Sequence, residues 1–281
     1  MMTNVANFKH PEFLVSVDWL LENLEDPNLR IYDCTAHLIP HPTETYTIGS
    51  GKGDYEKAHI PGADFLDLQQ ELSNNTSKLR FTFPSAEHFS KAIGAHGLSN
   101  DNQAILYSTT SPQWATRIWW MLRAFGFDNA KVLDGGLIRW VQKGYPTSTI
   151  PSTYPEQSFT AKPRPGLIIQ KSEVLEGIHE SNTCIINALS QEQHIGVGGR
   201  TYGRPGRIKD SENVPTTELI DPETNEFYPA AVIAERFASV GTQSSDRVLT
   251  YCGGGIAASA TAFLLTMLGP VSYTHLRAHE T

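Results

Sequence analysis

The uncharged run of residues 248–268 constrains the fold of this chain more than any other stretch. It is about as long as a helix that spans a membrane. Three glycines at positions 253–255 interrupt it, however, and each half that remains is too short to span. The first half favours a strand, and the second has helical character. We therefore predict a buried strand that ends at Cys252, a glycine turn and a buried helix, and no membrane segment.

Cys252 stands where a thiol becomes reactive. The glycines that follow it can adopt positive φ and turn successive backbone N–H groups toward one point. The start of the helix adds a partial positive charge. Both features favour the thiolate, which is the reactive form of cysteine. We therefore predict that Cys252 is a nucleophile rather than an inert core residue.

Length and composition limit the classes of protein to consider. A chain of 281 residues with 40% apolar residues is long enough for two domains of ordinary size. The net charge of −8 argues against non-specific binding of nucleic acid, and there is no basic tail. Cys34, Cys184 and Cys252 are too few, and odd in number, for a disulfide framework, which indicates a reducing compartment. Residues 1–11 are polar and lack the apolar core of a signal peptide, so we expect a cytoplasmic protein.

Strands alternate with helices in the first half of the chain. We predict strands at 29–33, 103–107 and 131–134, and helices capped by Ser16, capped by Ser85 and at 114–125. This alternation predicts a parallel sheet with helices on both faces, which is an α/β fold. Residues 37–52 are rich in Pro, Thr and Gly, and we expect them to form a loop.

The order of elements then starts again. Residues 147–166 hold four prolines, so we interpret them as a linker between a first domain at 1–146 and a second at 167–281. After the linker, the strand that contains Tyr251 corresponds to the strand that contains Tyr107 in the first half. This correspondence indicates an internal duplication at domain scale. Where the second copy has Cys252, the first has Ser108. We therefore expect one working site, in the second domain, and a non-catalytic first domain.

Several motifs carry a resemblance to a known family. They are Tyr55-Glu56-Lys57-Ala58-His59-Ile60-Pro61-Gly62-Ala63, Arg117-Ile118-Trp119-Trp120-Met121-Leu122-Arg123-Ala124-Phe125-Gly126, Val132-Leu133-Asp134-Gly135-Gly136 with Trp140, and Tyr251-Cys252-Gly253-Gly254-Gly255-Ile256-Ala257-Ala258. Together they resemble tandem-domain sulfurtransferases of the rhodanese superfamily, over residues 14–269. The resemblance implies two rhodanese-like domains with catalysis in the second.

The resemblance also implies a mechanism. Cys252 would take sulfur from a donor as a persulfide and hand it to a thiol, cyanide or a protein acceptor. A persulfide carries diffuse negative charge on its outer sulfur, which backbone N–H groups can hold without a side chain. The expected cradle consists of Gly253, Gly254, Gly255, Ile256 and Ala257. No cofactor is implied.

The resemblance implies that the sulfur donor is thiosulfate or 3-mercaptopyruvate. Thiosulfate-type members tend to carry a cation in the loop, and residues 253–259 have none. The glycine after the cysteine resembles the mercaptopyruvate type, which usually has Ser or Thr where this chain has Gly254. The family places substrate-binding arginines before Ile208, where this chain has Arg200, Arg204 and Arg207. Arg207 takes the position of His59 in the first copy, which favours a structural role for it.

Other chemistries fit the sequence less well. Cysteine phosphatases that share this fold need an arginine six residues after the cysteine, and that position is Ala258. No metal site is expected, because Pro40 and Pro42 prevent a helix that would bring His37 and His41 together. The remaining alternative is a non-catalytic binding or regulatory module that has kept the rhodanese fold.

The end of the chain departs from the family. The first copy has a strand and a turn at 132–136 followed by the helix of Trp140, and the second copy should offer the same. Residues 269–281 match only the start of such a strand, near Val271. We therefore expect the second domain to be incomplete at its C-terminus, with a tail that is not native from about Ser272, and its sheet to lose an element.

Overall fold

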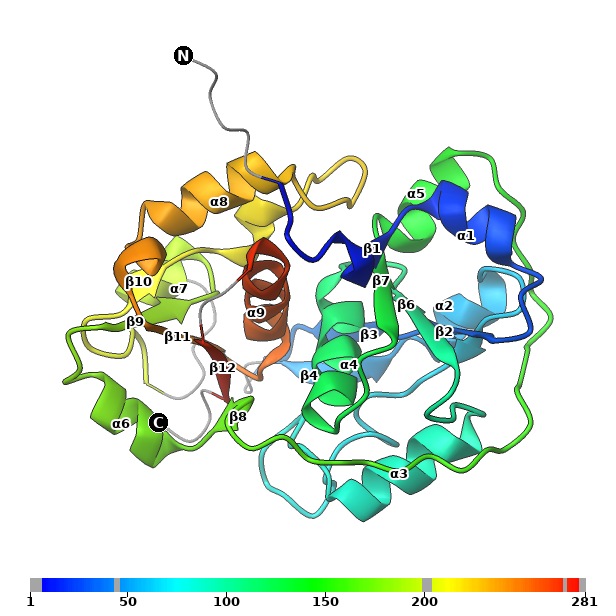
Figure 1. Ribbon diagram of the computed structural model, residues 1–281, viewed down its shortest axis with the longest axis horizontal. Helices are drawn as coiled ribbons and strands as arrows, with labels where there is room; N and C mark the ends of the chain where they lie inside the picture. The colour runs from blue at the N-terminus through cyan, green and yellow to red at the C-terminus, as the bar shows by residue number, and fades with distance from the viewer. Residues whose placement is uncertain (1–6, 43–45, 199–203, 270–271, 278–281) are drawn as a thin grey trace. The chain divides into compact units, whose positions relative to one another are not determined.

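The chain forms two compact units. The computed structural model describes residues 7–42, 46–198, 204–269 and 272–277, drawn in colour in Figure 1. The N-terminal unit consists of Glu12–Pro165 and Pro222–Glu226. The C-terminal unit consists of the described parts of Met1–Pro11, Gly166–Asp221 and Phe227–Thr281. Each unit is built around its own sheet.

The sheet of the N-terminal unit has five parallel strands. Their order is β1 (Leu14–Val15), β7 (Ala130–Leu133), β6 (Gln103–Tyr107), β2 (Leu29–Asp33) and β5 (Asp64–Phe65). The helices of this unit are α1 (Val17–Asn23), α2 (Lys52–Lys57), α3 (Ala86–Ala95), α4 (Gln113–Ala124) and α5 (Gly136–Gln142), with a 3₁₀ turn at Pro11–Phe13. The predicted parallel α/β sheet is confirmed.

Helices cover both faces of this sheet because each strand buries alternate side chains on opposite sides. On one face, Leu20 of α1 and Trp140 of α5 pack in one cluster with Ile31 and Ile105. On the other, α4 packs against β6 and β7, and the ring of Phe125 at its end stacks 4.3 Å from Phe89 of α3. The predicted caps are confirmed: Ser16 and Ser85 each accept a hydrogen bond from a backbone N–H in the first turn of their helix.

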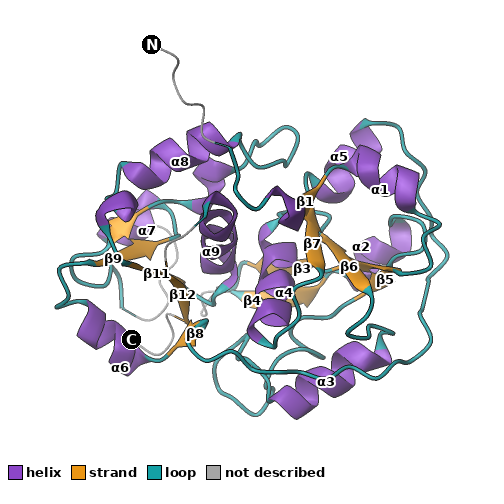
Figure 2. Cartoon of the chain, in the orientation of Figure 1, coloured by secondary structure: helices purple, strands orange, loops and turns teal. Residues whose placement is uncertain are grey.

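The sheet of the C-terminal unit has the same strand order. It runs β8 (Ile168–Ile169), β12 (Ser272–Arg277), β11 (Arg247–Cys252), β9 (Thr183–Asn187) and β10 (Glu212–Asn213), all parallel. The helices are α6 (Lys171–Gly177), α7 (Gln191–Ile195), α8 (Ala230–Ala238) and α9 (Ile256–Leu268), and 3₁₀ turns lie at Thr216–Leu219 and Thr242–Ser244. Within the described ranges, no helix is long and apolar enough to cross a membrane. Figure 2 shows β11 leading into the base of α9.

Two expectations about individual elements need correction. Residues 37–52 are not a plain loop, because β3 (Ala36–Ile39) and β4 (Thr47–Ser50) pair as an antiparallel hairpin. Its side chains are mostly half-exposed or exposed, so they leave no apolar pattern in the sequence. The second sheet also does not lose its last strand, because residues 272–277 form β12 between β11 and β8. Val271 and residues 278–281 lie outside the described residues.

Residues 147–165, which we call the strap, run along the N-terminal unit. The strap forms no helix or strand apart from a bridge between Ser148 and His59, as its prolines predict. It is fastened at several points: the Gln157 N–H donates to the Gly94 carbonyl at 2.9 Å, and the Phe159 side chain is buried. The predicted linker thus lies against the N-terminal unit over most of its length.

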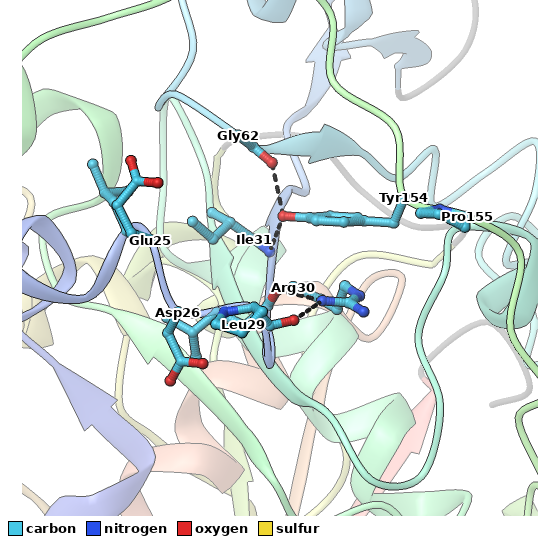
Figure 3. Close-up of a pocket in the computed structure, with 10 residues that line it drawn as sticks. Glu25, Asp26, Leu29, Arg30, Ile31, Gly62, Tyr154 and Pro155 are labelled. Atoms are coloured by element: carbon cyan, nitrogen blue, oxygen red, sulfur yellow. Dashed lines mark hydrogen bonds between the residues drawn. The ribbon is translucent and has the colours of Figure 1, made fainter.

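Tyr154 shows how the strap completes the sheet. Strand β5 covers only the end of β2, so the N–H of Ile31 lacks a strand partner there. The Tyr154 hydroxyl accepts that N–H at 2.9 Å and donates to the Gly62 carbonyl at 2.7 Å, as Figure 3 shows. These residues line a pocket of about 330 Å³ that contains none of the predicted site residues.

The surroundings of His96 predict how the stability of the N-terminal unit depends on pH. Its Nδ1 lies 2.7 Å from Asp64 Oδ2, and its Nε2 lies 3.2 Å from Glu71 Oε2. Burial disfavours the imidazolium, but the hydrogen bonds to the two carboxylates outweigh it and raise the pKa of His96 from 6.5 to about 9. A raised pKa stabilises the folded state below the unfolded pKa, and the effect is lost as pH rises through the folded pKa.

We expect the His96→Gln variant to be less stable than the unaltered chain by about 3 kcal/mol below pH 6. The difference in the free energy of unfolding should shrink between pH 6.5 and pH 9, and urea titrations at several pH values would measure it. A difference that stayed constant from pH 6 to pH 9 would show that His96 is not held as an imidazolium.

Candidate functional site

Cys252 is the last residue of β11, the central strand of the second sheet. Strands β9 and β12 flank β11 on its two sides, and all three run in the same direction. The carboxyl ends of parallel strands form the edge at which α/β sheets place their ligands. The position of Cys252 therefore follows from its place in the sequence and from the pairing of its strand.

The loop after Cys252 directs a backbone donor at the sulfur. The N–H of Gly255 lies 3.1 Å from Cys252 Sγ and donates to it. Gly255 has φ of 85°, in the left-handed region where a side chain would be strained. Its carbonyl accepts the Ser259 hydroxyl at 2.7 Å, which restrains the peptide unit that follows the donating N–H. The sulfur thus sits at the start of a helix of thirteen residues, where N–H groups and the helix dipole favour an anion.

Small apolar side chains surround the sulfur. Cys252 is 2% exposed and packs with Ala188 and Ala258, and Leu189 and Ala257 join the cluster. The predicted cradle residues 253–256 are buried, and Ala257 is half-buried. These apolar side chains offer the sulfur no hydrogen bond, whereas the main-chain N–H of Gly255 does.

Tyr251, the residue before Cys252, lies at the centre of a second cluster, which is held by hydrogen bonds. The hydroxyl of Tyr251 accepts the N–H of Ile208 and the side-chain amide of Asn187, each at 3.0 Å, and lies 2.8 Å from Ser211 Oγ. In the sequence, Tyr251 marks the correspondence of the two copies and belongs to the Cys252 motif, but nothing there assigns it a role of its own. Its partners come from β9 and from the segment before β10, so no local pattern would have identified them.

The predicted arginines lie on the segment before Ile208. Arg200 is outside the described residues, and Arg204 and Arg207 are exposed. Neither of these two forms an ion pair with a carboxylate in the part of the chain that the structure describes. Arg207 lies close enough to His194 of α7 to act on it: burial and the positive charge of Arg207 lower the pKa of His194. No pattern in the sequence pointed to His194.

The equivalent place in the N-terminal unit contains different chemistry. Ser108 follows β6 as Cys252 ends β11, and its hydroxyl donates to the Ser111 carbonyl. The buried Asp33 carboxylate accepts hydrogen bonds from Thr35 and Thr109, and burial raises its pKa. The loop after β6 thus presents hydroxyl groups, next to the carboxyl group of Asp33 at the end of β2, where the loop of the C-terminal unit follows a cysteine.

Comparisons with known proteins agree with this geometry. The family model described as a Rhodanese-like domain matches residues 16–143. "Thiosulfate/3-mercaptopyruvate sulfurtransferase 2" of Arabidopsis thaliana is 30% identical over 292 residues, which covers 95% of this chain and 82% of that protein. "3-mercaptopyruvate sulfurtransferase" of Escherichia coli K12 is also 30% identical, over 91% of this chain and 89% of that protein.

A solved structure matches both units. The crystal structure of SseA from Escherichia coli, titled as a 3-mercaptopyruvate sulfotransferase with the rhodanese fold, has a TM-score of 0.79 and 28% identity. The match covers 94% of this chain and 97% of that one. The chain therefore belongs to the sulfurtransferases of the rhodanese superfamily.

Proposed function

We propose that this sulfurtransferase carries sulfur as a persulfide on Cys252. The hydrogen bond from the Gly255 N–H to Cys252 Sγ carries the proposal, because it places a main-chain donor where a thiolate or persulfide needs one. The sulfur donors in the names of the relatives are thiosulfate and 3-mercaptopyruvate. Of the two, 3-mercaptopyruvate fits this chain better.

The charge of the loop favours this donor. Residues 253–259 contain no cationic side chain, although thiosulfate would bring two negative charges next to the thiolate. 3-Mercaptopyruvate brings one carboxylate, which a single arginine can bind in a bidentate fashion. Arg204 and Arg207 are exposed on the segment before Ile208, and we propose that this segment binds the carboxylate.

The proposed reaction has two steps. The Cys252 thiolate attacks the sulfur of 3-mercaptopyruvate, an S–S bond forms and the C–S bond breaks. The electron pair of that bond leaves on the enolate of pyruvate, which takes up a proton. A thiolate or cyanide then attacks the outer sulfur, the S–S bond breaks, and Cys252 leaves as a thiolate.

The persulfide itself is directly testable. Incubation with 3-mercaptopyruvate and no acceptor should add one sulfur atom to the intact protein, measured by mass spectrometry. Cys252→Ser should lose both the adduct and at least a thousandfold in turnover, because a hydroxyl is a far weaker nucleophile than a thiolate.

Cys184→Ser is the matched control. Burial raises the pKa of Cys184 to about 11, so it is a thiol at neutral pH and has no nucleophilic role. This variant should keep the adduct and the turnover. A Cys252→Ser protein that still gained sulfur or remained active would refute the proposal, and lack of turnover with either donor by the unaltered protein would favour a non-catalytic module.

The role of the arginines predicts a change in substrate affinity. Arg204→Ala or Arg207→Ala should raise KM for 3-mercaptopyruvate by about ten- to a hundredfold, because a charge-assisted hydrogen bond is lost. Steady-state kinetics with both donors would measure it. Arg236→Ala is the control, because Arg236 of α8 pairs with Glu218 at 2.7 Å, and it should leave KM unchanged. A higher kcat/KM for thiosulfate, or an unchanged KM in both loop variants, would contradict this assignment.

A further inference from the structure

We propose that Tyr251 is a positioning residue: its hydroxyl holds the segment of residues 204–208 at the catalytic strand and thereby sets the affinity for the carboxylate of the donor. The inference rests on the proposed function and adds a residue to it. Tyr251 need not touch the substrate, because it acts through the arginines that precede Ile208.

The hydrogen bonds around Tyr251 have one consistent orientation. The hydroxyl oxygen accepts from Asn187 Nδ2 and from the Ile208 N–H. Ser211 Oγ lies 2.8 Å from the Ile208 carbonyl and donates to it. The Tyr251 hydroxyl therefore donates its own proton to Ser211, across 2.8 Å. Burial raises the pKa of Tyr251, which keeps the phenol protonated and able to donate.

This arrangement ties a segment to a rigid strand. β11 is hydrogen-bonded on both sides, so Tyr251 and Cys252 have little freedom to move. Ile208 is held through both its N–H and its carbonyl, and its side chain packs in the cluster that contains Tyr251. Arg207 is the next residue along the chain. The cluster thus fixes where the segment with the arginines meets the strand that ends in the nucleophile.

The N-terminal unit contains a matched site that lacks the nucleophile. The Tyr107 hydroxyl accepts the Ile60 N–H at 3.2 Å and is hydrogen-bonded to Asp33. The residue before Ile60 is His59, whose two ring nitrogens contact the carbonyls of Tyr55 and Ile150. His59 therefore has anchors of its own, whereas Arg207 is exposed. The Tyr251 hydroxyl should therefore matter more for the position of Arg207 than the Tyr107 hydroxyl matters for the position of His59.

Tyr251→Phe removes the hydroxyl and keeps the ring. We expect KM for 3-mercaptopyruvate to rise about five- to tenfold while kcat at saturating donor stays within twofold, because the nucleophile and its N–H donor are unchanged. Tyr107→Phe is the control for losing a buried hydroxyl and should leave KM unchanged. Ser211→Ala removes the acceptor of the Tyr251 proton and should also raise KM. It replaces Tyr251→Phe as the test if that variant does not fold.

A double-mutant cycle tests whether Tyr251 acts through the arginines. In an Arg204→Ala/Arg207→Ala background, Tyr251→Phe should change KM less than twofold, because the group that it positions is gone. An unchanged KM in both Tyr251→Phe and Ser211→Ala, or a full and additive effect in that background, would overturn the inference. Those results would leave the persulfide on Cys252 standing, since its own test is the Cys252→Ser adduct.

Discussion

The hydrogen bond from the Gly255 N–H to Cys252 Sγ is the contact on which the site depends. It requires φ of 85° at Gly255, which glycine adopts without strain, and a carbonyl held by Ser259. It also requires that β11 end where α9 begins, so that the sulfur meets the start of the helix. The remaining parts of the C-terminal unit hold this junction in place, through strands on both sides of β11 and the apolar packing of α9.

The two units use one framework for different chemistry. In each, a tyrosine at the end of a central strand accepts the N–H of an isoleucine: Tyr107 with Ile60, and Tyr251 with Ile208. The polar residue on the neighbouring strand differs. Asp33 lies beside Cys34, and burial together with that carboxylate raises the pKa of Cys34 well above its usual value. The C-terminal unit has the neutral Asn187 instead, and an amide adds no negative charge near the end of the strand that carries Cys252.

Much of the fold could be predicted from local sequence. Ser16 and Ser85 are caps because a side-chain oxygen at that position satisfies an N–H of the first turn. The uncharged run around Cys252 identified β11 and α9 because both are buried on all sides. The hairpin β3–β4 was missed because its strands are short and half-exposed, and of β12 only the start near Val271 was expected, because the residues that follow look unlike the first copy. The domain boundaries at 1–146, 147–166 and 167–281 stay a prediction, although the strap packs on the N-terminal unit.

The sequence by itself determined the glycine turn after Cys252 and the resemblance to the rhodanese superfamily, and it singled out Cys252 as the predicted nucleophile, because each depends on residues that are adjacent in the chain. Only the tertiary structure decided which distant groups meet around them. Tyr251 joins Asn187, Ile208 and Ser211, and Arg207 comes close to His194. The parallel pairing of β9 with β11 sets Asn187 beside Tyr251, and that pairing leaves no mark on the residues near Cys252 in sequence.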